Sequence, residues 1–267
     1  MERVGVVSRF PEHLSHFAWG YYEVKGVTGV WRDAPSGAIP MVSVFGDNRV
    51  AKSHPEWVQV GPEGEAAVRA SRYFDWDALC PSHPGVMELA LEWVERAQEK
   101  TRTGRIRLDD VSFAREGFCV CGACRAARDV RGQDLPAYRQ DVIAAFVRTV
   151  HARAGSLEMT LYPDPLPGHL ETRFGIDVDR LAPWIDRWIV PIYDMHYATT
   201  YWLEILAQGF RERLTRPFVI ELYGLQVPEP ELLHAAQVAL AYADGVLIAY
   251  DNQLEKLLRI CERLGSE

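Results

Sequence analysis

Four acidic residues of this sequence stand at or near the ends of short β-branched segments. They are Asp109, Asp110, Asp194 and Glu221. Glu221 is flanked by apolar residues on both sides, and a carboxylate in that setting is costly unless it is paired or functional. Hydrolysis of a glycosidic bond requires two carboxyl groups, one to protonate the leaving oxygen and one to attack the anomeric carbon or activate water. The pattern therefore indicates a glycosidase that cleaves O-glycosidic bonds.

The assignment of roles among these acids has alternatives. In the first scheme Glu221 is the nucleophile, Asp110 is the general acid/base, and Asp109 orients the sugar. In the second scheme Asp109 attacks and Asp194 protonates the leaving oxygen. A purely structural alternative also exists, because Arg107 and Asp109 share one face of their segment and could form an ion pair inside the fold.

Aromatic residues are frequent near the same segment ends. Flat apolar rings with polar tips suit the faces of sugars, although many such rings are ordinary core residues. We expect four of them to contact substrate, namely Trp57, Tyr162, Tyr193 and Tyr223.

Cysteine is concentrated in the run Cys119-Val120-Cys121-Gly122-Ala123-Cys124, with Cys80 as the obvious fourth thiol. Four thiolates can surround one tetrahedral zinc ion and leave no position open for water, which is typical of a structural site. We therefore predict structural Zn²⁺ bound by Cys80, Cys119, Cys121 and Cys124. An iron–sulfur cluster is the alternative, and Cys261 is expected to be a buried apolar residue.

Histidines offer a third kind of chemistry. His54, His83 and His196 lie near expected loops, and a metal-dependent hydrolase could use them with aspartates. They lack a ligand spacing such as His-x-His, so this reading is weaker than the two-carboxylate one.

The elements that would position these residues alternate between strands and helices. Such alternation predicts a parallel sheet, and eight units in 267 residues predict one (β/α)8 TIM barrel domain over residues 1–267. An open, doubly wound sheet is the alternative, but no Gly-rich phosphate turn follows the first strand. The expected strands are Arg3–Ser8, Val27–Arg32, Ile39–Phe45, Arg105–Asp110, Leu157–Tyr162, Trp188–Tyr193, Phe218–Leu222 and Gly245–Tyr250. The expected helices are Pro84–Lys100, Pro136–Ala154, Thr199–Leu214, Pro230–Ala243 and Asn252–Leu264.

Two connections depart from the regular pattern. Asp33–Ala38 is too short to hold a helix between the second and third expected strands. Gly46–His83, after the third strand, is expected to be a long loop excursion over the C-terminal rim, where long loops usually serve function. The cysteine-rich loop follows the fourth strand.

Composition excludes several classes of partner. The net charge is −8 and no block of Lys and Arg stands out, so nucleic acid is not expected. No stretch of 18 apolar residues predicts a membrane span, and the N-terminal apolar stretch is too short for a signal peptide. We expect a cytoplasmic protein that binds carbohydrate, and the sequence leaves homo-oligomerisation open.

One stretch resembles a known family. Leu79-Cys80-Pro81-Ser82-His83-Pro84, then a helix, a strand that ends in acids and Cys-x-Cys-x-x-Cys, is similar to the catalytic domain of family 42 β-galactosidases. Related, poorly characterised barrel glycosidases share the cysteine run and the motif seen here as His54-Pro55-Glu56-Trp57. The similarity covers about His54 to Arg125, with Glu221 as a further anchor.

The resemblance implies structural zinc, a general acid/base at the Asp109-Asp110 position and a nucleophile at Glu221. The family has Asn-Glu where this chain has Asp109-Asp110, and Asp is about 1.5 Å shorter than Glu. Carboxyl groups about 5–5.5 Å apart retain configuration and those about 6.5–9.5 Å apart invert it, so the stereochemical outcome stays open. The shorter acid also keeps a second function open, that of a catalytically inactive carbohydrate-binding barrel.

Overall fold

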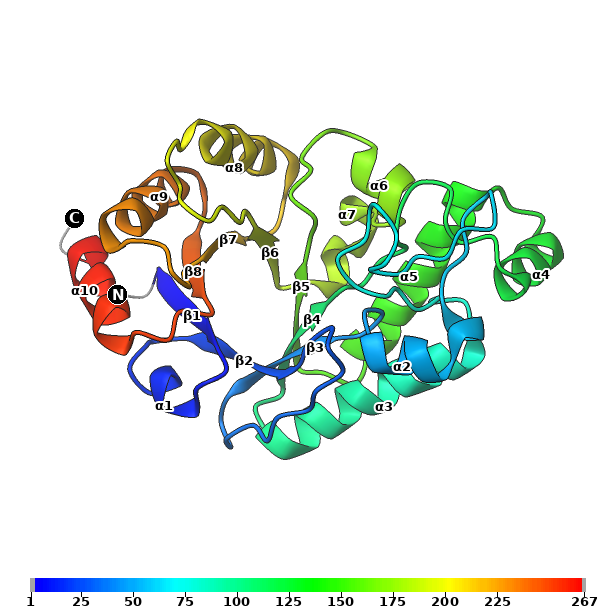
Figure 1. Ribbon diagram of the computed structural model, residues 1–267, viewed down its shortest axis with the longest axis horizontal. Helices are drawn as coiled ribbons and strands as arrows, with labels where there is room; N and C mark the ends of the chain where they lie inside the picture. The colour runs from blue at the N-terminus through cyan, green and yellow to red at the C-terminus, as the bar shows by residue number, and fades with distance from the viewer. Residues whose placement is uncertain (1–2, 266–267) are drawn as a thin grey trace.

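The computed structural model describes residues 3–265 and contains a closed barrel of eight parallel strands that pair in chain order (Figure 1). The predicted (β/α)8 barrel is therefore confirmed. The strands are β1 (Val4–Ser8), β2 (Gly20–Lys25), β3 (Ile39–Ser43), β4 (Arg105–Asp109), β5 (Ser156–Thr160), β6 (Arg187–Pro191), β7 (Phe218–Tyr223) and β8 (Gly245–Ala249).

Helices surround the barrel as the sequence pattern indicates, and five long ones match the predicted ranges to within a few residues. These are α3 (Pro84–Thr101), α5 (Leu135–His151), α8 (Tyr201–Arg213), α9 (Glu229–Tyr242) and α10 (Leu254–Gly265). Shorter helical segments complete the described chain, namely α1 (Pro11–Leu14), α2 (Asn48–Ser53), η1 (Pro55–Trp57), α4 (Gly122–Arg131), α6 (His169–Phe174), α7 (Val178–Leu181) and η2 (Ala182–Trp184). None of the helices within residues 3–265 has both the length and the apolar character needed to cross a membrane.

The second strand is the clear error of the sequence prediction. The sequence predicts a strand at Val27–Arg32, but the strand is Gly20–Lys25, and the predicted segment is a loop. Gly29 adopts φ 72°, a left-handed conformation that interrupts an extended chain. The real strand was hidden because it places the polar residue Glu23 inward, where Arg9 and Arg32 pair with it.

Side-chain alternation along the strands decides what faces the interior of the barrel. Val219 of β7 belongs to the cluster of apolar residues inside the barrel, whereas its neighbours Phe218 and Ile220 belong to the core between strands and helices. Successive side chains of a strand point to opposite faces, so Glu221 shares the inner side with Val219. The inner cluster contains Val7, Tyr21, Ile39, Met41, Ile189, Val219, Leu247 and Ala249.

The segment between β3 and α3 is the long excursion that the sequence predicts. It contains α2, which Asp47 caps by accepting hydrogen bonds from the backbone of Arg49 and Val50 at 2.8 Å. Antiparallel bridges pair Gly46 with Ala78 and tie the segment back on itself. The segment therefore brings both Trp76 and Cys80 to defined positions near the barrel.

Candidate active site and cysteine cluster

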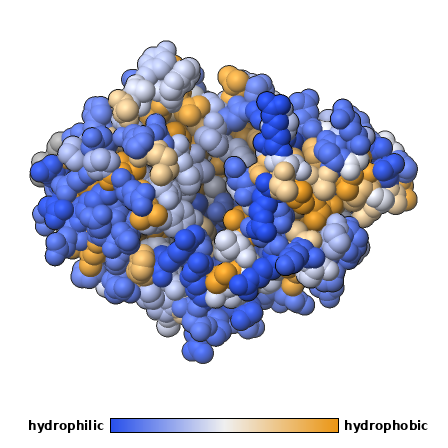
Figure 2. All heavy atoms as spheres, viewed as in Figure 1, coloured by the Kyte–Doolittle hydropathy of each residue, from blue (hydrophilic) through white to orange (hydrophobic). Residues whose placement is uncertain are grey.

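Three of the four predicted acids line one cavity. Asp109 is the last residue of β4, Asp110 follows it, and Glu221 comes from β7. All three line a cavity of about 450 Å³, and its aromatic walls include Trp76, Tyr162, Tyr193 and Tyr250. The surface in Figure 2 is mostly hydrophilic and is hollowed over the middle of the barrel. The structure thus brings together a pair of neighbouring carboxyl groups, a third carboxylate and a set of aromatic rings.

Asp110 is held in an unusual backbone conformation and a tight contact. Its φ is 56°, which is uncommon for a residue with a side chain. Its Oδ2 forms a short hydrogen bond with the Ser43 hydroxyl. Gly46 lies so near that a Cβ atom there would be 3.0 Å from this oxygen. These contacts fix the carboxyl group at the edge of the cavity.

Burial raises the pKa of Asp110 to about 8, and the nearby charge of Asp109 contributes to the rise. The hydrogen bonds agree with a protonated carboxyl group. The Ser43 hydroxyl has one proton, and it also lies 2.9 Å from the carbonyl oxygen of Gly46. If Ser43 donates its proton to the Gly46 carbonyl, the hydrogen bond between Ser43 and Asp110 requires a proton on the Asp110 carboxyl group, which then donates to the Ser43 oxygen. Asp110 can therefore hold a proton at neutral pH.

Asp109 lies against Asp110 and Arg107. Its Oδ1 accepts a hydrogen bond of 3.2 Å from the backbone N–H of Asp110. Burial raises its pKa, while the positive charge of Arg107 opposes that rise. Two adjacent carboxyl groups in one partly buried site disfavour double ionisation, which helps to keep the proton on Asp110.

Glu221 is fully buried and engaged at both of its oxygens. Oε2 forms an ion pair with Arg107, and Oε1 accepts a hydrogen bond from the Tyr193 hydroxyl. The alternative that Arg107 pairs with Asp109 is therefore wrong, because the ion-pair partner of Arg107 is Glu221. Tyr193, which the sequence predicts to contact substrate, is therefore in direct hydrogen-bonding contact with Glu221.

We expect Arg107→Met to lower the free energy of unfolding by about 3–5 kcal/mol, because it leaves the buried Glu221 carboxylate without its cation. The measurement is denaturant unfolding at neutral pH. Arg105→Met on the same strand is the matched control: Arg105 is 37% exposed and pairs with Glu158, which also has Arg187 at 3.9 Å. Equal losses in the two variants would contradict a dominant role for the Arg107–Glu221 pair.

Two predicted site residues lie elsewhere. Trp57 does not line the cavity: its ring stacks on His54 at 4.1 Å and lies 5.2 Å from His83, near the start of α3. Asp194 is exposed on the loop after β6, where its Oδ1 accepts the backbone N–H of His196 at 2.9 Å. Tyr162 and Tyr193 line the cavity, and Tyr223 lines a cavity next to it. Within residues 3–265, the only group of three or more potential metal-ligating side chains is the cysteine group, which gives the histidine-based hydrolase no support.

Sequence reasoning missed other residues at this site. Tyr250 follows β8 with φ 65°, and the Arg9 guanidinium lies 4.7 Å from its ring centre. Its place just after a strand was the signal that could have identified it. Lys25 forms a fully buried ion pair with Asp47 at 3.0 Å and donates a 2.8 Å hydrogen bond to the Ser43 carbonyl. That support could not be found, because Lys25 was outside the predicted strand.

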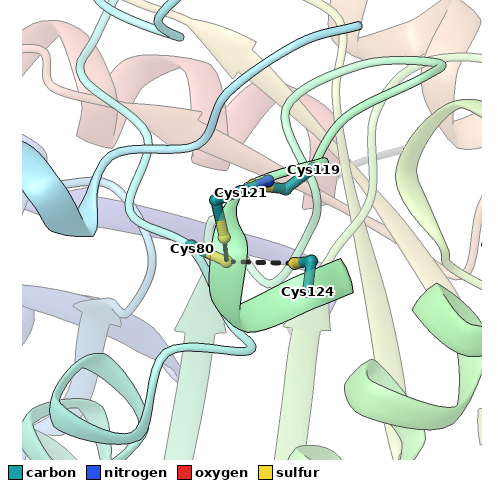
Figure 3. Close-up of side chains that lie close together, drawn as sticks. All are labelled: Cys80, Cys119, Cys121 and Cys124. Carbon is teal, nitrogen blue, oxygen red and sulfur yellow. Dashed lines mark hydrogen bonds between the residues drawn. The ribbon is translucent and has the colours of Figure 1, made fainter. Parts of the chain in front are cut away.

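The four predicted cysteines converge, as Figure 3 shows. Cys80 comes from the loop before α3, whereas the other three come from the loop before α4 and its first turn. All four sulfur atoms lie within 4.8 Å of one another. The sulfur of Cys80 is 3.6 Å from that of Cys121 and 3.4 Å from that of Cys124.

The geometry of this cluster fits a tetrahedral metal. Four sulfurs at the usual Zn–S bond length form a tetrahedron with edges of about 3.8 Å. The sulfur of Cys119 also accepts backbone N–H groups from Val60 at 3.2 Å and Cys121 at 3.4 Å, which stabilises a thiolate. Cys261 is buried on α10 outside this cluster, as expected. The cluster is therefore compatible with a metal site that has no open position.

Comparisons with known proteins identify the fold. The glycoside hydrolase domain of PgaB from Bordetella bronchiseptica is similar over 99% of this chain and 98% of its own, with TM-score 0.67 and 12% identity. The α-L-fucosidase isoenzyme 2 of Paenibacillus thiaminolyticus gives TM-score 0.65 and 15% identity over all of this chain and 49% of its own. A GH20 exo β-N-acetylglucosaminidase from Vibrio harveyi gives TM-score 0.58 and 10% identity, over 93% of this chain and 50% of its own.

At these low identities the similarity shows the barrel fold, and these neighbours are glycoside hydrolases. This chain spans about half the length of the fucosidase and of the β-N-acetylglucosaminidase. No protein-family model matches the chain, and no curated protein does. The resemblance to family 42 therefore gains no support from the comparisons.

Proposed function

We propose that this protein is a glycoside hydrolase in which Asp110 is the general acid. The observation that carries the proposal is the placement of three carboxyl groups on one cavity with aromatic walls, where burial raises the pKa of Asp110 to about 8. A general acid must be protonated at working pH and still be able to release its proton in the transition state. The proposal is also supported by analogy of fold, because the structural neighbours are glycoside hydrolases.

In the proposed reaction the proton of Asp110 passes to the glycosidic oxygen as the bond from that oxygen to the anomeric carbon breaks. Glu221 is the second carboxylate. It either stabilises the positive charge that develops at the anomeric carbon or attacks that carbon as a nucleophile. Arg107 and Tyr193 keep Glu221 oriented, since each holds one of its oxygens. The oxygen of a water molecule then bonds to the anomeric carbon, displacing Glu221 where that residue has attacked, and the proton that the water loses returns to the Asp110 carboxylate.

The test is a screen of the wild-type protein against α- and β-linked aryl glycosides, with calorimetric binding of the corresponding sugars in parallel. N-acetylglucosaminides come first, because one structural neighbour is named for cleaving them. Turnover that depends on Asp110 is the expected result. An intact protein that turns over no glycoside in the panel would remove the hydrolase proposal.

The second candidate function is carbohydrate binding without turnover. The specific observation in its favour is the engagement of both Glu221 oxygens by Arg107 and Tyr193, which restrains a nucleophile. Calorimetric binding of sugars by a protein that hydrolyses none of them is the outcome that selects this function.

For the cysteine cluster we propose structural zinc. Four sulfur ligands leave no site for water, so the metal would fix the loops rather than take part in the reaction. It would join the β3–α3 segment to the loop after β4, and both carry residues that line the cavity, Trp76 and Val111 among them. The cysteine arrangement is also the feature that resembles family 42 β-galactosidases.

A further inference from the structure

The central cavity continues in two directions. It shares Val27, Asp109 and Tyr250 with a second cavity of about 370 Å³. It shares Trp76, Asp110 and Tyr162 with a third cavity of about 150 Å³. Asp109 therefore lines both the central and the second cavity, and Asp110 lines both the central and the third, so the acid pair lies between three adjoining cavities, which we call the cleft and its two arms.

The arm of the cleft beyond Asp109 is lined by the rings of Tyr223 and Tyr250, whose centres are 6.4 Å apart. Tyr193 lines the central cavity, and its ring centre is 5.5 Å from that of Tyr223. The Arg9 guanidinium packs on Tyr250 and is neutralised by Glu23, with its Nη2 3.0 Å from Oε2. This arm offers flat rings and hydrogen-bonding groups to a chain of sugars.

The opposite arm, beyond Asp110, carries a positive charge without a carboxylate partner. The Arg115 guanidinium lies 4.3 Å from the ring centre of Tyr73, and no carboxylate of residues 3–265 lies within 4.0 Å of it. Arg173 lines the same arm, but it is paired with Asp164 at 3.1 Å. The arm thus contains guanidinium hydrogen-bond donors that a polar ligand could accept from.

We propose that this cleft binds an oligosaccharide with units on both sides of the acid pair, and that cleavage takes place at an internal bond. An enzyme that removes terminal units needs a cavity on only one side of its acids, whereas here a cavity adjoins the acid pair on each side. The inference rests on the proposed glycosidase function for the cleavage step, but the extended binding site stands on the shape of the cleft alone.

The binding experiment uses Asp110→Asn, which cannot supply the proton, and calorimetry with defined oligosaccharides of one to six units in neutral, amino-sugar and acidic series. The expected result is that affinity for one series rises by at least tenfold from one unit to three or more, because each arm adds contacts. Binding of the monosaccharide as tight as that of its oligomers, or binding of no oligomer in any series, would overturn the inference.

Variants of the two arms test each side. Thr28 is exposed, and it lines the arm beyond Asp109, so Thr28→Trp fills this arm whereas Thr28→Val leaves it open. Arg115→Ala removes the donor of the other arm. Its matched control is Arg72→Ala, because Arg72 lies 5.2 Å from the same Tyr73 ring centre but outside the cavity. Thr28→Trp and Arg115→Ala should each weaken oligosaccharide binding at least fivefold, whereas the two controls should not.

The wild-type products separate the inference from the proposed function. Internal cleavage releases fragments of several lengths early in the reaction. Hydrolysis that releases only single units, with no effect of the arm variants, would overturn the inference and leave the glycosidase intact. Length-dependent binding without hydrolysis by the wild type would instead keep the extended site and reject the glycosidase.

Discussion

Replacing Asp110 with asparagine is expected to lower kcat/KM by about 10²–10⁴-fold on glycosides with poor leaving groups. Asparagine keeps the shape of the side chain but cannot donate the proton that the leaving oxygen needs. Aryl glycosides with good leaving groups depend less on protonation, so their loss should be much smaller. The measurement is kcat/KM for wild type and variant over a series of leaving groups.

The pH dependence gives the same residue a second signature. The proton on Asp110 is lost as the pH rises through about 8, so wild-type activity should fall on that alkaline side. The folded-state pKa lies above the ordinary aspartate value of 3.8, so the folded state binds more protons than the unfolded state between these values. Stability contributed by this group is therefore present at low pH and decreases as the pH rises through about 8.

The pH dependence of stability distinguishes a loss of catalytic activity from a loss of folding stability in the Asp110→Asn variant. Above pH 8 the Asp110→Asn variant should be at least as stable as the wild type, because it avoids a buried charge. Asp194→Asn, the same change at an exposed acid away from the cavity, should leave kcat/KM unchanged. Loss of activity at Asp194 with full activity at Asp110 would instead favour the scheme in which Asp109 attacks and Asp194 protonates.

Replacing Cys121 with serine is expected to remove most of the bound metal and to destabilise the fold strongly. A structural site binds the folded state far better than the unfolded chain, so the free energy of metal binding contributes to folding. The wild type should contain about one zinc per chain by elemental analysis. The variant should contain much less and should unfold at a lower denaturant concentration.

Cys261→Ser is the matched control, because it also replaces a buried thiol by a hydroxyl but lies outside the cluster. It should keep the full metal content, and its unfolding should not respond to zinc any differently from that of the wild type. Metal content that is unchanged in Cys121→Ser would reject the four-thiolate site. Iron in place of zinc would favour the iron–sulfur alternative.

The barrel and the cysteine site could be read from the sequence because both depend on local patterns. Short β-branched runs and helical spacings predict seven of the strands and five long helices close to their observed ranges. The run from Cys119 to Cys124 brings three thiols together by spacing alone. The second strand failed because Glu23 faces inward, and a local pattern does not show that Arg9 and Arg32 neutralise it.

The sequence by itself determined the repeat of strand and helix, the place of Asp109, Asp110 and Glu221 near strand ends, and the four thiols. Only the tertiary structure decided that Arg107 pairs with Glu221, that Trp57 and Asp194 lie away from the cavity, and that Asp110 is pressed against Ser43. The physical reason is distance along the chain. Charge pairing and burial depend on residues that are far apart in sequence, 114 positions for Arg107 and Glu221, and only the closed barrel brings them together.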